Sequence, residues 1–202
     1  MKRLFILTLC MVSLLSIFIL SVSAAESYTV VKGDSMWKIA VKYEVGLSEI
    51  KSANPQIKNP DLIYPGQVFT IPTTDASVLS FEKEVVRLVN EIRKQNGLAE
   101  LTYDWQLSRV ARIKSEDMRD NKYFSHTSPT YGSPFQMMKS FGISYRSAGE
   151  NIARGQATPQ KVVDAWMNSS GHRANILNSS FTHIGVGYAE NGRYWTQMFI
   201  GK

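Results

Sequence analysis

The 202-residue sequence predicts an α+β protein made of two separately folded units. Two observations carry this prediction. Residues 28–71 read as strand, helix, helix and strand, and the later part reads as amphipathic helices followed by two strands joined by Asn191-Gly192. An Asn-Gly pair between apolar stretches is the strongest short hairpin signal. Helices that lead into an antiparallel hairpin are typical of helices covering a sheet.

The first 24 residues have the pattern of a secretory signal peptide. Lys2 and Arg3 precede an apolar stretch from Leu4 to Leu20, and the small-residue site Val22-Ser23-Ala24 follows it. This order favours cleavage before Ala25 over a permanent anchor, although the apolar stretch is close to the length of a membrane span. We therefore expect a secreted protein that keeps no stable membrane anchor after signal cleavage.

The cysteine content and the net charge of the chain indicate how it is stabilised and which partners it favours. Cys10, the single cysteine, lies inside the signal segment, so the cleaved protein has no disulfides and depends on its hydrophobic cores. Residues 1–24 hold two of the 23 basic residues and none of the 17 acidic ones, which leaves 21 against 17, a net charge of +4. A mild positive charge favours anionic wall polymers or membrane surfaces over neutral ones. Without a dense basic stripe and interleaved aromatics, we expect no nucleic-acid partner.

The elements of the first unit follow from local signals. Residues 28–31 have the composition of a strand. Asp34 or Ser35 is placed to cap a helix whose apolar positions recur from Met36 to Tyr43. A second short helix and a turn then lead into a strand at residues 67–71. The order is β-α-α-β.

Residues 27–72 resemble a LysM module along its whole length, through the stretches YTVVKGDSMWKIA and NPDLIYPGQVFTIP. LysM modules bind glycans that contain N-acetylglucosamine, chiefly peptidoglycan and chitin, in a groove between two loops. An acetamido sugar suits such a groove because backbone groups bond the amide and apolar side chains cover the methyl group. The resemblance implies these glycan-binding residues: Gly33, Asp34, Ser35, Met36, Asp61, Leu62 and Ile63. For Leu62 and Ile63, core packing is an equal alternative.

A break in pattern separates the two units. The stretch PTTDASVLS is small, polar and without periodicity, which predicts a linker at residues 73–80. The second unit, residues 81–202, has an ordinary single-domain size.

The second unit is expected to begin with three helices. The first carries an apolar face from Phe81 to Ile92, and the second runs from about Asp104 to Asn121. Thr158-Pro159 is a good cap and first-turn pair for a third helix, which buries Trp166. The two strands on either side of Asn191-Gly192 complete the unit.

Four polar side chains stand out among apolar or turn-forming neighbours. His126 lies in YFSHTSP, Glu150 in AGENIA, and His172 and His183 in GHRANILNSSFTHIGVGY. A carboxylate with imidazoles is a donor set for zinc, and equally a general acid/base set with tuned pKa values. Hydrogen-bonded structural histidines are a third interpretation. The chain has no HExxH or GxSxG motif, so the residues alone leave these alternatives open.

Five motifs in order resemble the bacterial branch of the CAP superfamily, which includes cysteine-rich secretory proteins, antigen 5 and pathogenesis-related proteins 1. The motifs span residues 81 to 200: LVNEIRKQNGLAELTYDWQLSRVARIKSEDM, YFSHTSP, AGENIARG, AWMNSSGHRANILN and IGVGYA with YWTQMF. The resemblance implies an α-β-α sandwich for the second unit. Eukaryotic members of this superfamily place two histidines and two glutamates around a central cleft.

Carried over to this chain, the first histidine matches His126, the glutamate of the GEN motif matches Glu150, and the later histidine matches His183. The second glutamate is expected about three residues after Trp166, where the chain has no carboxylate. His172 is expected to project into that vacated space. The resemblance thus implies one cleft lined by all four residues. The cofactor is unknown; if it is a divalent metal such as zinc, His126 and His183 are its ligands.

Two functions follow. The first is an exported wall-associated protein that binds peptidoglycan, or another N-acetylglucosamine glycan, through LysM. Its CAP cleft would then bind a partner, including proteins of the envelope or a spore layer. The second is a peptidoglycan-anchored hydrolase or protease in which Glu150 is the acid/base and His126 and His183 hold substrate or metal. Tethering raises the local substrate concentration for such an enzyme. The missing second carboxylate favours the first function and leaves enzymatic activity open.

Overall fold

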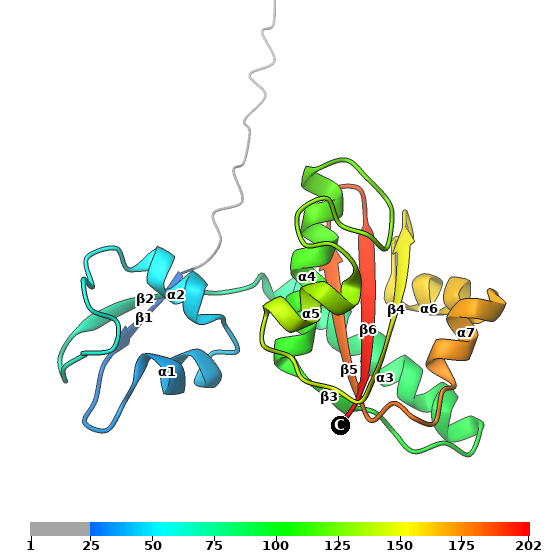
Figure 1. Ribbon diagram of the computed structural model, residues 1–202, viewed down its shortest axis with the longest axis horizontal. Helices are drawn as coiled ribbons and strands as arrows, with labels where there is room; N and C mark the ends of the chain where they lie inside the picture. Colours follow the sequence, from blue (N-terminus) through cyan, green and yellow to red (C-terminus); the bar gives the residue numbers. More distant parts are fainter. Residues whose placement is uncertain (1–24) are drawn as a thin grey trace, which may run out of the picture.

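The computed structural model describes residues 25–202, so the expected signal peptide at residues 1–24 lies outside the described residues. Two units follow each other along the chain (Figure 1). Within residues 25–202 no helix has the length and apolar character needed to cross a membrane.

The N-terminal unit has the predicted β-α-α-β order. It consists of β1 (Ala25–Thr29), α1 (Met36–Lys42), α2 (Leu47–Ala53) and β2 (Val68–Pro72). The two strands pair in antiparallel fashion from Ala25↔Pro72 to Thr29↔Val68. Their inner faces and the two helices enclose a small core that includes Ile39, Ile50, Phe69 and Ile71.

A buried amide joins the helices of this unit to its sheet. Asn54 is 1% exposed, and its Nδ2 donates to the carbonyl oxygens of Ile50 at 2.8 Å and Thr70 at 2.7 Å. Its Oδ1 accepts from Thr70 N at 2.8 Å. These bonds satisfy the end of α2 and the edge of β2 at one point, which gives a unit without disulfides a polar cross-link between its layers.

The C-terminal unit is built on one four-stranded sheet in the order β3-β5-β6-β4. The strands are β3 (Thr102–Tyr103), β4 (Ser147–Arg154), β5 (His183–Ala189) and β6 (Tyr194–Gly201). The predicted hairpin is the antiparallel β5–β6 pair, and β4 adds to the outer side of β6. β3 pairs with β5 in parallel.

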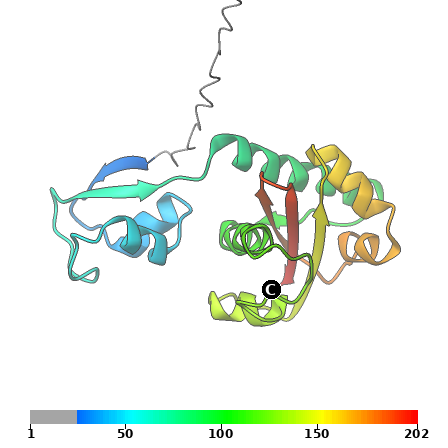
Figure 2. The ribbon, with the colours of Figure 1, turned by 90° about the horizontal axis from the view of Figure 1, so that it is seen from above.

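Helices cover both faces of this sheet, which confirms the α-β-α sandwich (Figures 1 and 2). On one face lie α4 (Trp105–Asp120) and α5 (Pro134–Ser140). On the other lie α3 (Ala76–Gln95), α6 (Pro159–Met167) and α7 (Ser170–Ile176).

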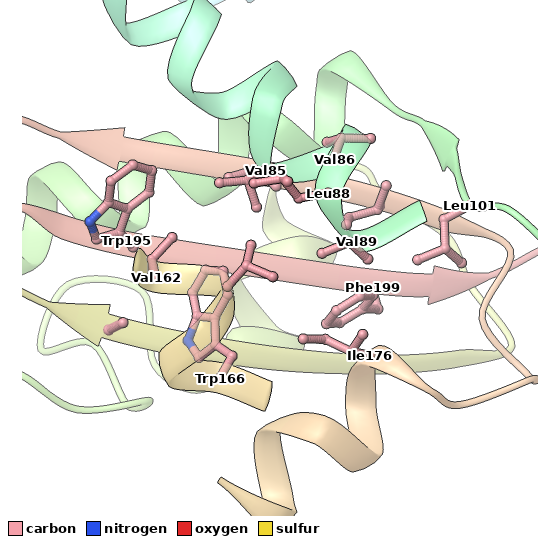
Figure 3. Packing of buried hydrophobic residues seen from close by; sticks show 14 of the residues in the cluster. Val85, Val86, Leu88, Val89, Leu101, Val162, Trp166, Ile176, Trp195 and Phe199 are labelled. Atoms are coloured by element: carbon pink, nitrogen blue, oxygen red, sulfur yellow. The ribbon is translucent and has the colours of Figure 1, made fainter. Parts of the chain in front are cut away.

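Each face of the sheet has its own hydrophobic core, and the core beneath α3, α6 and α7 is larger than the one beneath α4 and α5. Figure 3 shows Val85 and Val89 of α3 and Trp166 of α6 packed over Trp195 and Phe199 of β6. The indole N–H groups of the two tryptophans donate to backbone carbonyls, so both rings are buried with their polar atoms satisfied. The prediction that the third helix buries Trp166 is confirmed, and Trp195 and Tyr194 are buried as well.

The opposite face depends on two glycines in β5. A Cβ on Gly187 would lie 2.0 Å from Arg112 N, and one on Gly185 would lie 2.4 Å from the Leu107 carbonyl carbon. Only glycine lets the backbone of α4 come this close to the sheet. The IGVGYA motif therefore encodes a helix–sheet contact, and that contact fixes the depth of α4 and of its buried side chains.

One boundary differs from the sequence prediction. α3 begins at Ala76 inside the expected linker, because Asp75 caps it: its Oδ1 accepts from Ser77 N at 2.7 Å. Only residues 73–75 lie between β2 and α3. Four elements of the second unit were not predicted from the sequence: β3, β4, α5 and α7. β4 contains a glycine, a glutamate and an asparagine, residues depleted in strands, so its strand conformation comes from pairing with β6 and not from propensity.

An ion pair joins the two units. Arg109 of α4 binds Glu49 of α2 through two contacts, Nε to Oε1 at 2.5 Å and Nη2 to Oε2 at 2.7 Å. Gly46 lies directly beside this pair, where a Cβ would meet Glu49 Oε2 at 2.1 Å and Arg109 Cζ at 2.3 Å. A bidentate pair fixes orientation as well as distance, so it holds the face of α2 against α4.

Candidate functional site

A groove of about 260 Å³ lies between the two loops of the N-terminal unit. Six of the seven expected glycan-binding residues line it: Asp34, Ser35, Met36, Asp61, Leu62 and Ile63. Leu62 is 52% exposed, whereas Ile63 is half-buried against the core. Leu62 is therefore available to a ligand, and Ile63 both packs and lines the groove.

The first loop of the groove is ordered by Asp34 and Ser35. Asp34 Oδ2 accepts from Tyr28 OH at 2.7 Å and Val31 N at 2.9 Å, and these bonds lower the pKa of Asp34, the Val31 bond most strongly. Ser35 is the helix cap, with Oγ accepting from Lys38 N at 3.2 Å. The loop is held in one shape by its own side chains, which suits a preformed glycan groove.

Gly33 is the expected groove residue that does not line the groove. Its φ of +93° lies in the left-handed region that favours glycine, and its carbonyl accepts from Lys38 Nζ at 2.7 Å. Its role is to turn the chain from β1 into α1.

Pro60, in the loop expected to form one side, also lines the groove, and three further lining residues were missed from the sequence: Trp37, Leu47 and Lys51. Trp37 is 50% exposed. A signal for it was present, because the helical spacing that buries Met36, Ile39 and Ala40 leaves Trp37 on the outer face of α1. A half-exposed tryptophan beside a groove adds a flat apolar wall to it.

In the C-terminal unit, β4 and the loop after α4 bring Glu150 and His126 together. His126 Nδ1 lies 2.7 Å from Glu150 Oε1. The Glu150 side chain is 1% exposed and that of His126 is 54% exposed. Burial raises the pKa of Glu150 despite its bond to His126. The same bond raises the pKa of His126.

One oxygen of this buried carboxylate is free. Glu150 Oε2 is buried and has no hydrogen-bond partner among the described residues. A buried carboxylate oxygen without a partner loses its hydration without compensation, so it is a group that a donor from a ligand or a water would satisfy. Glu150 is therefore the centre of the candidate cleft.

Asp117 fixes the loop that carries His126. Its carboxylate accepts from Ser128 Oγ and Thr130 Oγ1 at 2.7 and 2.8 Å, and also from Asn121 and the hydroxyl of Tyr123. Burial alone would raise the pKa of Asp117, but these hydrogen bonds hold it below its usual value. None of these residues was singled out from the sequence, because their partners lie together only in the fold.

α7 brings His172 to the edge of β4. Asn151 Nδ2 donates to the His172 carbonyl at 3.1 Å, and Asn175 Nδ2 donates to the carbonyl of Glu150 at 3.2 Å. Asn151 and Asn175 therefore hold α7 against β4. Burial lowers the pKa of His172, and the charge of His126 lowers it further, so the two imidazoles are electrostatic neighbours.

His183 does not join this group. It is the first residue of β5, and β6 lies between β5 and the strand that carries Glu150. Its Nδ1 lies 2.8 Å from Thr182 Oγ1, and its charged neighbours are Lys202 and Asp104. The structure thus brings His126, Glu150 and His172 together and leaves out His183. The resemblance matched the later family histidine to His183, and the structure does not place this residue beside His126 and Glu150.

The residues present do not fit a divalent metal. Within residues 25–202 no three or more His, Cys, Asp or Glu side chains are grouped so that they could hold a metal ion. The expected ligands lie apart, since His126 is in the loop after α4 and His183 begins β5, and His126 Nδ1 is engaged by Glu150.

Comparison with known proteins assigns both units. Residues 28–72 match the LysM domain model, and residues 86–199 match the model of the cysteine-rich secretory protein family, CAP. The chain belongs to the CAP family. Its N-terminal unit is a LysM domain that precedes the CAP domain.

The chain is similar to uncharacterized protein YkwD of Bacillus subtilis (strain 168), with 63% identity over 133 residues, 66% of this chain and 52% of YkwD. It is also similar to the spore coat assembly protein ExsA of Bacillus cereus, 48% identical over 46 residues, 23% of this chain and 7% of ExsA. Among solved structures, an extracellular protein containing a SCP domain from Bacillus anthracis str. Ames matches with a TM-score of 0.61 and 36% identity. That match covers 68% of this chain and 47% of that one. The chain therefore spans about half the length of YkwD and of the B. anthracis protein.

Proposed function

We propose that this protein is exported and held on peptidoglycan by its LysM groove, while its CAP domain presents the Glu150 cleft to a second component of the wall. LysM and CAP domains together support a cell-wall-associated protein. A location in a spore envelope is a narrower form of this proposal, supported by the similarity to a spore coat assembly protein.

The groove carries the proposal. Its loops are ordered by their own hydrogen bonds, and two half-exposed apolar side chains, Trp37 and Leu62, line it. Backbone amides beside apolar walls are the surroundings that an acetamido sugar needs. Exposed apolar side chains gathered at a groove mark a binding surface.

The test is co-sedimentation of the full protein with purified peptidoglycan sacculi. Leu62→Ser removes an apolar contact in the groove, and we expect binding to weaken by about fivefold to tenfold. Val68→Ser is the matched control, because Val68 is 56% exposed in the same domain but does not line the groove. Equal binding by wild type and Leu62→Ser would reject the groove as the glycan site.

A hydrolase is the second candidate function. The observation that favours it is Glu150, a buried carboxylate with a raised pKa beside His126 and with one oxygen unpartnered. A carboxylate whose pKa is raised by burial is suited to general acid/base catalysis. Against it, the region three residues after Trp166 carries no second carboxylate to share the work.

Soluble muropeptides distinguish the two functions. Release of fragments from sacculi by wild type, and not by Glu150→Gln, would establish the hydrolase. We expect no fragments from either protein, with binding to the pellet unchanged by Glu150→Gln.

A further inference from the structure

Lys114 is a fully buried cation directly below the loop that carries His126. Its exposed fraction is 0%. Its Nζ donates to Tyr123 OH and to the Ser125 carbonyl, each at 2.9 Å, and lies 4.7 Å from the centre of the Tyr123 ring. Ser125 directly precedes His126, so Lys114 holds the backbone next to this histidine.

A buried ammonium needs a nearby negative charge. Burial lowers the pKa of Lys114, and the two carboxylates whose charges oppose this effect are Glu150 and Asp117. Asp117 is engaged by four donors, as described above. Glu150 has one hydrogen bond, from His126, and its other oxygen has no partner. Glu150 is therefore the counter-charge that Lys114 shares with the cleft.

A divalent cation at Glu150 would compete with this arrangement. It would need the carboxylate that already balances Lys114, and it would lie in a low-dielectric site near a fixed like charge, where repulsion is strong. It would also have to displace the bond between His126 Nδ1 and Glu150 Oε1. The donor set and the charge balance agree in disfavouring a metal here.

We infer that Lys114 is the resident cation of the CAP cleft: it provides Glu150 with the positive charge that a bound metal ion would otherwise provide, and so it excludes divalent metals from the cleft. The unpartnered Glu150 Oε2 then accepts from a neutral donor, such as a hydroxyl group or an amide N–H. This inference rests on the proposed role of the Glu150 cleft as a ligand site and makes its specificity explicit.

The test measures metal binding to the full protein at pH 7 by two methods. Calorimetry measures the binding of Zn²⁺, and the broadening of the His126 and His172 ring resonances in NMR reports the binding of Mn²⁺. Wild type is expected to show no Zn²⁺ binding that depends on Glu150 and no broadening in about 1 mM Mn²⁺. The dissociation constant for Mn²⁺ would then be weaker than about 1 mM. Lys114→Met, which keeps length and removes charge, is expected to bind Zn²⁺ at least about tenfold more tightly. Adding Glu150→Gln to that variant should remove the gain.

Lys114→Arg is the control that keeps the charge, and it should bind metal as weakly as wild type. His183→Ala identifies any Zn²⁺ held by the separate histidine of β5. Two results overturn the inference: Glu150-dependent metal binding by wild type, or a folded Lys114→Met protein that binds no tighter than wild type. If Lys114→Met does not fold, the wild-type measurement decides alone, because ring broadening by Mn²⁺ contradicts the inference and its absence upholds it.

Binding to sacculi, measured on the same proteins, separates this inference from the proposed function. The LysM groove contains neither Lys114 nor Glu150, so all variants that fold should bind sacculi as wild type does. If the wild-type protein does not bind sacculi, the proposed function is rejected and the metal result is unaffected.

Discussion

His126 Nδ1 lies 2.7 Å from Glu150 Oε1, and the two side chains differ in environment: the glutamate is 1% exposed and the histidine 54%. The half-exposed His126 ring therefore lies between the buried Glu150 carboxyl group and solvent. Because each group acts on the protonation of the other, the pair titrates as a unit.

The three histidines should therefore titrate in a fixed order. The bond to Glu150 raises the pKa of His126 above 6.5, whereas burial lowers the pKa values of His172 and His183 below 6.5. We expect ring resonances in NMR to show this order, and Glu150→Gln to lower the His126 value without moving His183. A His126 pKa at or below that of His183 in wild type would contradict the geometry.

The same shift makes stability depend on pH. Because the folded-state pKa of His126 lies above its unfolded value, its contribution is complete below about pH 6.5 and is lost as the pH rises through the folded pKa. Urea unfolding of wild type and His126→Gln should therefore differ more at pH 5.5 than at pH 8. The difference should stay below about 1 kcal/mol, since the ring is half-exposed to solvent. A difference that grows with pH would contradict the assigned shift.

Among the polar residues near Glu150, Asp117 should have the largest effect on the free energy of unfolding when it is substituted. Asp117→Asn removes the charge from four hydrogen bonds that fix residues 121–130, and we expect a loss of about 2–3 kcal/mol in unfolding free energy. Asp120→Asn is the control, because Asp120 is exposed and pairs only with Arg119 at the surface. Its effect should be within about 0.5 kcal/mol of zero.

How much of this arrangement the sequence predicts depends on the kind of signal. Caps and turns act locally, so Ser35, Asp104, Thr158 and Asn191-Gly192 were found from the sequence where the structure has them. β4 and α7 lack such signals, since β4 has Ile152 as its one strong strand former and α7 is a seven-residue helix. Both are fixed by tertiary contacts.

The candidate site divides in the same way. Glu150 and His126 were predicted through motifs, whereas the later histidine was assigned to His183, since nothing in the sequence revealed α7, the helix that carries His172. Lys114 and Asp117 gave no signal, because a lysine and an aspartate in an amphipathic helix are normally exposed. Their burial follows from the depth of α4, which Gly185 and Gly187 set.

Gly187→Ala should consequently be severely destabilising. The added methyl would lie 2.0 Å from Arg112 N and 2.1 Å from the Ala111 carbonyl carbon, so α4 would have to move away from the sheet. We expect a loss of about 3 kcal/mol or more in urea unfolding, at the upper end of overpacking effects. Gly171→Ala, where nothing lies within 4 Å, should be neutral or stabilising by up to about 1 kcal/mol. Similar effects of the two changes would reject the close approach.

The Glu49–Arg109 pair should govern the relative orientation of the two domains. Glu49→Arg and Arg109→Glu should each release the LysM domain, and the double exchange should restore docking in part. Residual dipolar couplings test this, because docked domains share one alignment tensor and released domains do not. High salt should weaken docking, since Glu49 is partly exposed. A shared tensor in both single variants would show that other contacts hold the domains.

The central claim is that the LysM groove holds this protein on an N-acetylglucosamine glycan. The most direct measurement is co-sedimentation of the full protein with peptidoglycan sacculi in the presence of soluble sugar tetramers. Tetramers of N-acetylglucosamine should displace the protein from the pellet, and tetramers of glucose, which lack the acetamido group, should not. Protein that stays in the pellet with both tetramers, or leaves it with both, would contradict the claim.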